Sequence, residues 1–176
     1  MYGFDTTSDD YVLKSLSDPL EPGIGYWIVS LDPASIDVEG DFVEPVVGSP
    51  CASPRGCFEY VLIGPDGSPP GEQYQMIGMP FPGVSIPWKD VRIVTPEGTA
   101  YTPDAAFNAQ ILDRHIFKYN GSEYDVYDAT TEGMEGQLDG FDGIWIRTTA
   151  QTITEFFPDG AKLLIPVEPI SLPPSP

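Results

Sequence analysis

The chain is poor in basic residues, in histidine and in cysteine, and each shortage argues against a class of function. Its 176 residues hold 8 Lys and Arg against 27 Asp and Glu, a formal net charge of −19. That charge repels phosphate backbones, so nucleic acid is disfavoured as a partner. No apolar run approaches the roughly 20 residues of a membrane-spanning helix, so we expect no membrane insertion. Two cysteines and the single histidine, His115, cannot complete a tetrahedral zinc shell without carboxylates.

Glycine, proline and hydrophobic residues are abundant by contrast. The 18 Gly and 20 Pro indicate many turns and few long helices. A hydrophobic content of 41% is enough for a folded core and excludes disorder throughout. Short apolar runs separated by turn signals predict eight to ten short strands. The expected fold is therefore all-β, a β-sandwich or a compact barrel with one short helix.

The helix and one hairpin have clear local signals. Thr102 is expected to begin a helix that residues 105–112 continue for about two turns. Asn120-Gly121 is the preferred two-residue type I′ connection and predicts a hairpin between the flanking strands. This turn would place Lys118 opposite Glu123, and Phe117 opposite Tyr124.

The two cysteines, Cys51 and Cys57, bracket a short segment in which Pro54 and Gly56 favour a turn. A disulfide is therefore expected, and two unrelated thiols are the alternative. Closing so small a loop contributes about 2–3 kcal/mol in the chain-entropy model. A disulfide, high acidity and proline-rich turns together predict an extracellular or cell-surface protein.

Two stretches, residues 20–30 and 138–148, nearly repeat each other, with Leu, Gly, Trp and Ile at the same offsets. Each is expected to form a turn followed by a strand, and together they indicate a duplicated unit. We expect both tryptophans to anchor the core rather than to bind a ligand. The structural anchors predicted on this basis are Leu20, Gly25 and Trp27 in the first copy, and Leu138, Gly143 and Trp145 in the second.

This repeat divides the chain into four parts. Residues 1–47 would be an incomplete N-terminal copy packed into the same β domain. Residues 48–72 would be a loop-rich connection that carries the disulfide, and residues 73–167 the complete copy. The proline-rich residues 168–176 have the composition of a linker or tail, and the N-terminus lacks the features of a signal peptide. These features predict a segment of a larger protein.

The order of motifs resembles a tandem β-rich module of bacterial secreted and cell-surface proteins, the GWNLIG/GYW type. The matching motifs are a strand at 74–81, Trp88-Lys89-Asp90-Val91, Tyr119-Asn120-Gly121, and a turn and strand at 138–146. Tyr74 stands where the family motif begins with Trp, and Phe141-Asp142 replaces a simpler turn. The resemblance implies surface localisation and a tandem arrangement, with neighbouring domains of the parent protein as partners. It supplies no catalytic residues.

Clustered acids suggest calcium, because hard cations take several oxygen ligands from flexible loops. Asp37, Glu39 and Asp41 alternate and would point the same way on a strand. Asp139 and Asp142 lie in a glycine-rich turn whose carbonyls could assist. The alternative is a solvated acidic surface without bound metal.

No motif identifies a catalytic site. The sequence contains neither a phosphate-binding glycine loop nor a Gly-x-Ser-x-Gly elbow. We expect His115 to be a hydrogen-bonded structural residue. The carboxylate pairs Asp125 with Asp128, or Glu132 with Glu135, could serve a small glycan-active hydrolase, but nothing singles them out.

The function expected from the sequence is therefore non-catalytic. The chain would be a structural, adhesive or ligand-binding module of a larger secreted or cell-surface bacterial protein. Its partner would be carbohydrate, since aromatic residues are plentiful, or another surface protein.

Overall fold

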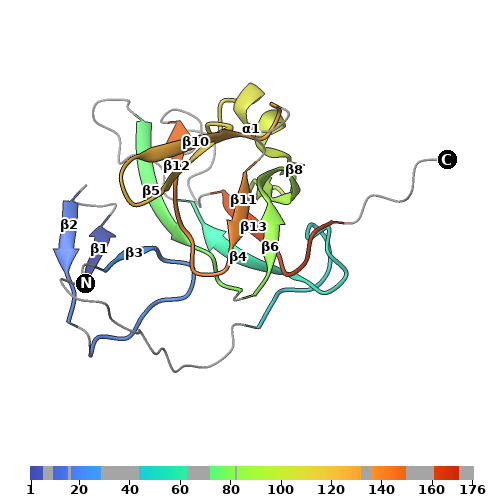
Figure 1. Cartoon of the computed structure of the whole chain (residues 1–176). Coiled ribbons are helices and arrows are strands. Elements are labelled where there is room, and N and C mark those ends of the chain that lie inside the picture. The colour runs from blue at the N-terminus through green and yellow to red at the C-terminus, as the bar shows by residue number, and fades with distance from the viewer. Residues whose placement is uncertain are drawn as a thin grey trace.

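The computed structural model describes residues 1–5, 10–15, 17–28, 44–62, 72–81, 83–131, 136–149 and 161–170. Within these ranges the chain forms thirteen strands, one α-helix and one 3₁₀ turn, which confirms the all-β class (Figure 1). The strands outnumber the eight to ten expected because several contain only two or three residues. No helix in the described part of the chain is long and apolar enough to cross a membrane.

One four-stranded antiparallel sheet, which we call the central sheet, has the strand order β10-β9-β12-β5. Its strands are β5 (Glu72–Gly78), β9 (His115–Tyr119), β10 (Tyr124–Asp128) and β12 (Gly143–Thr149). Successive side chains on a strand point to opposite faces of a sheet. One face, which we call the inner face, carries the buried isoleucines Ile77, Ile116, Ile144 and Ile146.

The opposite face of this sheet, the outer face, is defined by the alternate residues. The register places on it Tyr74 and Met76 of β5, His115, Phe117 and Tyr119 of β9, Tyr124, Val126 and Asp128 of β10, and Trp145 and Arg147 of β12. None of the outer-face residues belongs to the main core cluster. The two faces of one sheet are thus chemically different.

A second four-stranded sheet, in the order β4-β13-β7-β8, supplies the other half of the core. Its strands are β4 (Cys57–Val61), β7 (Arg92–Val94), β8 (Ala100–Tyr101) and β13 (Lys162–Pro166). Phe58, Ile93 and Leu163 from this sheet join the inner-face isoleucines in one buried cluster. The strands β6 (Ser85–Pro87) and β11 (Gln137–Asp139) form a two-stranded sheet and contribute Ile86 and Leu138 to the same cluster.

The 3₁₀ turn η1 (Trp88–Asp90) and the helix α1 (Pro103–Asn108) complete the core. The fully buried Trp88 donates its indole N–H to the carbonyl oxygen of Arg114 at 2.8 Å. The helix begins as predicted, since the Thr102 hydroxyl accepts the N–H of Ala105 at 3.3 Å. It ends four residues before the predicted residue 112, because Gln110 adopts a left-handed φ of 58°.

The predicted disulfide between Cys51 and Cys57 is present. It lies on the second sheet, on the side away from the main core, where Cys57 clusters with Val94 and Leu164. The bond therefore joins the segment before β4 to the sheet itself.

The hairpin between β9 and β10 has a different register from the predicted one. Tyr119 pairs with Tyr124, so the connection has four residues rather than two, and Lys118 faces Asp125 instead of Glu123. A type I′ turn needs positive φ at both central residues. Only Gly121 has it, at 102°. The Asn120 side-chain oxygen instead accepts the N–H groups of Ser122 and Glu123, which stabilises the longer turn.

Three N-terminal strands form a small sheet in the order β2-β1-β3, beside β5 in Figure 1. They are β1 (Tyr2–Asp5), β2 (Asp10–Leu13) and β3 (Tyr26–Trp27). Residues just before β3 run along β5: the Gly25 N–H donates to the Met76 carbonyl at 3.2 Å, and Gly78 N–H to Gly23 at 2.9 Å. A Cβ atom at Gly25 would lie 2.4 Å from Met76 Cγ, so this close approach requires glycine.

The two near-repeats differ in structure. Leu138 is 1% exposed and belongs to the core, whereas Leu20, predicted as a structural anchor, is 39% exposed and lies outside the core. Gly25 packs against β5, whereas a Cβ atom at Gly143 would meet nothing. The two tryptophans differ as well, since Trp27 of the two-residue β3 is partly exposed and Trp145 of the seven-residue β12 is 9% exposed. Neither belongs to the main core cluster, where both were expected. The duplication stays a prediction from the sequence.

Candidate functional site

The outer face of the central sheet contains a pocket of about 420 Å³ with an unusual lining. Among the residues that the structure describes, five side chains line it, and all of them are aromatic: Phe4, Tyr74, Phe117, Tyr124 and Trp145. We call this the aromatic pocket. Ligand sites typically have volumes of about 300–1,000 Å³ and mostly apolar walls. The pocket therefore has the size and lining of a small-molecule site.

Four of these side chains are positioned by strand alternation and pairing. Trp145 of β12 lies directly opposite Phe117 of β9, so their side chains are neighbours on the outer face. The rings of Tyr74 and Phe117 meet edge to face, with centroids 6.0 Å apart and planes at 63°. Adjacent strands of one rigid sheet thus hold most of the pocket.

The fifth side chain comes from the N-terminal sheet, which packs on the outer face. Phe4 meets Trp145 edge to face at 4.7 Å, and Tyr11 approaches the same indole at 6.4 Å. Trp27 packs against Tyr119 at 5.0 Å in the same way. The N-terminal sheet therefore covers part of the outer face and supplies one wall of the pocket.

The pocket has a buried floor and an open rim. Trp145 is only 9% exposed, whereas Tyr74 and Tyr124 are 39% and 44% exposed. Burial raises the pKa of Tyr11 beside the pocket, repulsion from Tyr124 raises it further, and the nearby Trp27 side chain lowers it by less. The Tyr11 hydroxyl is therefore neutral at physiological pH.

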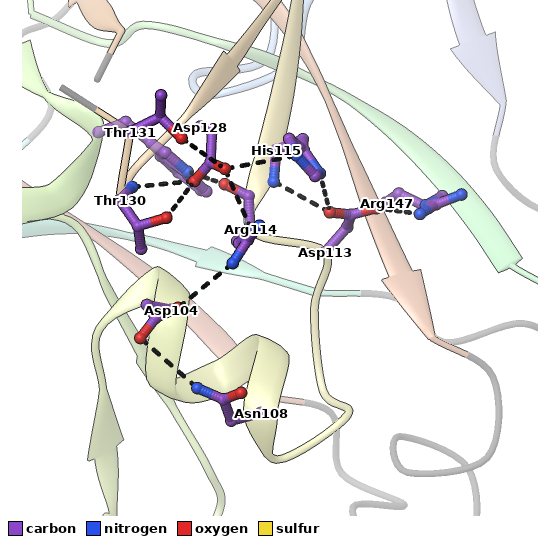
Figure 2. A network of polar contacts seen from close by, with 10 residues as sticks. Asp104, Asn108, Asp113, Arg114, His115, Asp128, Thr130, Thr131 and Arg147 are labelled. Carbon is purple, nitrogen blue, oxygen red and sulfur yellow. Dashed lines mark hydrogen bonds and ion pairs between the residues drawn. The ribbon is translucent and has the colours of Figure 1, made fainter. Parts of the chain in front are cut away.

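A network of polar contacts, drawn in Figure 2, includes the outer-face residues His115, Asp128 and Arg147. At its centre is Asp113, which is 2% exposed. Its Oδ1 accepts the backbone N–H of His115 at 3.0 Å and lies 2.6 Å from Nδ1 of the same residue. Its Oδ2 accepts a hydrogen bond from Arg147. Burial raises the pKa of Asp113, but the bonds from His115 and Arg147 outweigh it and hold the pKa below its usual value.

Asp128 forms a second buried centre in this network. It accepts the N–H and hydroxyl of Thr130 at 2.9 and 2.8 Å, and the hydroxyl of Thr131 at 3.1 Å. Arg114 Nε lies 3.2 Å from its Oδ2, and His115 Nε2 lies 3.7 Å from the same oxygen. Burial raises the pKa of Asp128, but these hydrogen bonds and Arg114 together lower it below its usual value.

We call Asp113, Arg114, His115, Asp128 and Arg147 the polar row. It adjoins the aromatic pocket on two strands. His115 lies two residues from Phe117 on β9, and Arg147 lies opposite Tyr74 and two residues from Trp145 on β12. The prediction that His115 is hydrogen-bonded agrees with its contact to Asp113.

The acids predicted to bind calcium have a different environment. Lys118 Nζ lies 3.4 Å from Asp139 Oδ2 and 2.5 Å from Asp142 Oδ2, and Asp142 also accepts the Asp139 N–H at 2.8 Å. Burial lowers the pKa of Lys118, but the two carboxylates outweigh it and raise the pKa overall. The ammonium group therefore already neutralises one of the two carboxylate charges in this turn.

The remaining predicted acids do not form a visible site. Asp37, Glu39 and Asp41 lie outside the described residues, as do Glu132 and Glu135. Asp125 and Asp128 point to opposite faces of β10, since they are three residues apart on one strand, so they do not form a carboxylate pair. Among the residues that the structure describes, no group of three or more His, Cys, Asp or Glu could hold a metal ion.

Sequence reasoning did not identify the aromatic pocket. The sequence does carry a signal for it in residues 115–119 and 124–128. There every second residue lies on the outer face, and most of these residues are aromatic or polar. Alternation alone does not show which face of the sheet another segment covers. Phe4 lies more than 60 residues before Tyr74, the next pocket residue in the chain.

No protein-family model, curated protein or solved structure matches this chain significantly. The resemblance to GWNLIG/GYW-type modules therefore stays a prediction, and the function must be argued from the site itself.

Proposed function

We propose that the protein is a non-catalytic carbohydrate-binding module of a larger secreted or cell-surface protein, and that its binding site is the aromatic pocket. The observation that carries this proposal is the convergence of five aromatic side chains on one open pocket of about 420 Å³. The disulfide supports the extracellular location, because such bonds persist in oxidising compartments.

The chemistry of the pocket suits a sugar ring. A pyranose has apolar C–H faces and hydroxyl groups around its edge. Aromatic rings offer flat apolar surfaces for such faces, and tyrosine adds a polar hydroxyl at its tip. Tyr74 and Tyr124 on the rim combine both properties and remain partly exposed. A sugar would therefore stack on the floor and hydrogen-bond at the rim.

The charge of the chain restricts the kind of sugar. A net charge of −19 repels anionic ligands over the range of the protein's field. Uronic acid polymers and sulfated glycans are thus disfavoured. We propose neutral glycans as ligands.

The lining of the pocket favours binding over hydrolysis. Glycoside hydrolysis normally uses two carboxyl groups about 5–10 Å apart on either side of the bond. None of the described residues that line the aromatic pocket carries a carboxyl group. The nearby acids Asp113 and Asp128 already accept several hydrogen bonds each.

Tryptophan fluorescence tests the proposal, since Trp145 forms part of the pocket. The probes are neutral hexasaccharides of glucose, xylose, mannose and N-acetylglucosamine. We expect saturable binding of at least one probe, and a loss of tenfold or more in affinity in Tyr74→Ala. Phe141→Ala is the matched control, because Phe141 is 84% exposed and does not line the pocket. Absence of binding by all four, or equal losses in both variants, would overturn the proposal.

A further inference from the structure

We propose that the binding site extends past the aromatic pocket into the polar row, where His115 and Arg147 hydrogen-bond a second sugar ring. The ligand would then be a neutral oligosaccharide of at least two rings rather than a single sugar. This inference rests on the proposed function and adds the length of the ligand and two specificity-determining residues to it.

The strand register places the two parts of the site one step apart. His115 is the next outer-face residue after Phe117 on β9, and Arg147 is the next after Trp145 on β12. Two residues of an antiparallel strand span about 6.8 Å, a length comparable to one sugar ring in a chain. A ring stacked in the pocket would therefore place the following ring at His115 and Arg147.

Asp113 prepares these two side chains for a ligand. Burying a carboxylate is costly unless its oxygens are hydrogen-bonded. Here the bonds that satisfy Asp113 come from His115 and Arg147, both of which remain partly exposed. The buried acid thus fixes the orientation of two partly exposed polar groups beside an apolar pocket. Binding sites gain affinity when supporting hydrogen bonds hold their contact residues in place.

The geometry of His115 indicates what it would bind. Nδ1 of His115 hydrogen-bonds Asp113 Oδ1 at 2.6 Å, so Nε2 is the ring nitrogen left to meet a ligand. Nε2 faces Asp128 Oδ2 at 3.7 Å, a distance longer than a hydrogen bond. A hydroxyl group both donates and accepts hydrogen bonds, so it could bridge Nε2 and this carboxylate oxygen. Sugar hydroxyl groups have this chemistry.

The test uses the fact that His115 is the only histidine in the chain. Its imidazole signals in an NMR spectrum therefore need no assignment. The titrants are the hexasaccharide that binds in the fluorescence assay and the matching monosaccharide. We expect both to perturb Trp145 and only the hexasaccharide to shift the His115 signals.

Two variants decide the outcome. His115→Gln should weaken hexasaccharide binding fivefold or more and leave monosaccharide binding unchanged. Arg147→Lys keeps a positive charge beside Asp113 and should also weaken hexasaccharide binding but not monosaccharide binding. It replaces His115→Gln as the test if that variant folds poorly. Lys162→Ala is the control, since Lys162 pairs with Glu59 on the second sheet.

An unchanged ratio of hexasaccharide to monosaccharide affinity in both polar-row variants would overturn the extended site, whether or not the His115 signals shift. If Tyr74→Ala still abolished binding in that case, the aromatic pocket would stand as the site. If none of the four probes binds, the proposed function and this inference are overturned together.

Discussion

The two faces of the central sheet carry different side chains on the same four strands. The inner face presents isoleucines such as Ile116 and Ile146, which are completely buried in the shared core. The outer face presents aromatic rings such as Tyr74 and Tyr124, which remain more than a third exposed. Branched aliphatic side chains fill a core at high density, whereas tyrosines offer a flat surface with a polar tip.

This comparison separates stability from binding. Apolar area removed from water contributes about 25 cal/mol per Å², so the buried inner face supplies most of the stabilisation from this sheet. The exposed rings contribute less to folding, and a surface that holds several of them together is typical of an interaction site. Substitutions on the inner face should therefore mainly lower the free energy of unfolding, whereas substitutions on the outer face should mainly weaken binding.

The largest expected effect on stability comes from the inner face. Ile146→Ala removes a fully buried side chain and should lower the free energy of unfolding by about 2–5 kcal/mol. Urea unfolding followed by circular dichroism measures the change. A loss below 1 kcal/mol would mean that the inner face is not the core that the structure shows.

A smaller effect is expected where the N-terminal sheet joins β5. Gly25→Ala places a Cβ atom against Met76 Cγ, so the two segments must separate, at a cost of about 1–3 kcal/mol. Because Phe4 belongs to the same N-terminal sheet, probe binding should weaken as well. Gly143→Ala, in open space, is the matched control, and equal effects of the two substitutions would contradict this attachment.

Acid should destabilise the protein through the polar row. Hydrogen bonds and neighbouring cations lower the pKa of Asp113 and Asp128 in the folded state below the ordinary value of 3.8. Their contribution is complete above that value, and it is lost as pH falls through the lowered pKa, because the unfolded chain takes up protons first. Unfolding free energies between pH 6 and pH 2 test this.

Asp113→Asn should flatten the decline in stability over that range, since one of the two shifted carboxyl groups is then absent. A variant that keeps the full decline would show that Asp113 is not responsible for it. Asp104→Asn, on the partly exposed side of Arg114, provides the comparison.

The sequence was sufficient for features that depend on neighbours in the chain. The all-β class, the start of the helix at Thr102 and the Cys51–Cys57 bond follow from composition, capping and loop length. The hairpin register was wrong because the Asn120 side chain, and not the Asn-Gly backbone, determines the turn. Side-chain bonds of this kind are not visible in a dipeptide preference.

The candidate site could not be predicted from the sequence, for a different reason. Strand alternation places Phe117 and His115 on one face, but only the packing of distant segments shows that Phe4 covers part of that face. The near-identity of the two segments was equally misleading for Leu20, because Leu20 lies outside the strands and is partly exposed, whereas Leu138 lies in β11 and packs in the core.

The double variant Tyr74→Ala/Tyr124→Ala tests the division between the two faces most directly. Both side chains are partly exposed and line the aromatic pocket. We predict that its free energy of unfolding stays within about 1 kcal/mol of the native protein, whereas its affinity for the neutral hexasaccharide falls at least 100-fold, as expected for the loss of two anchoring aromatics. Unchanged affinity, or a loss of binding accompanied by unfolding, would contradict the assignment of binding to the outer face.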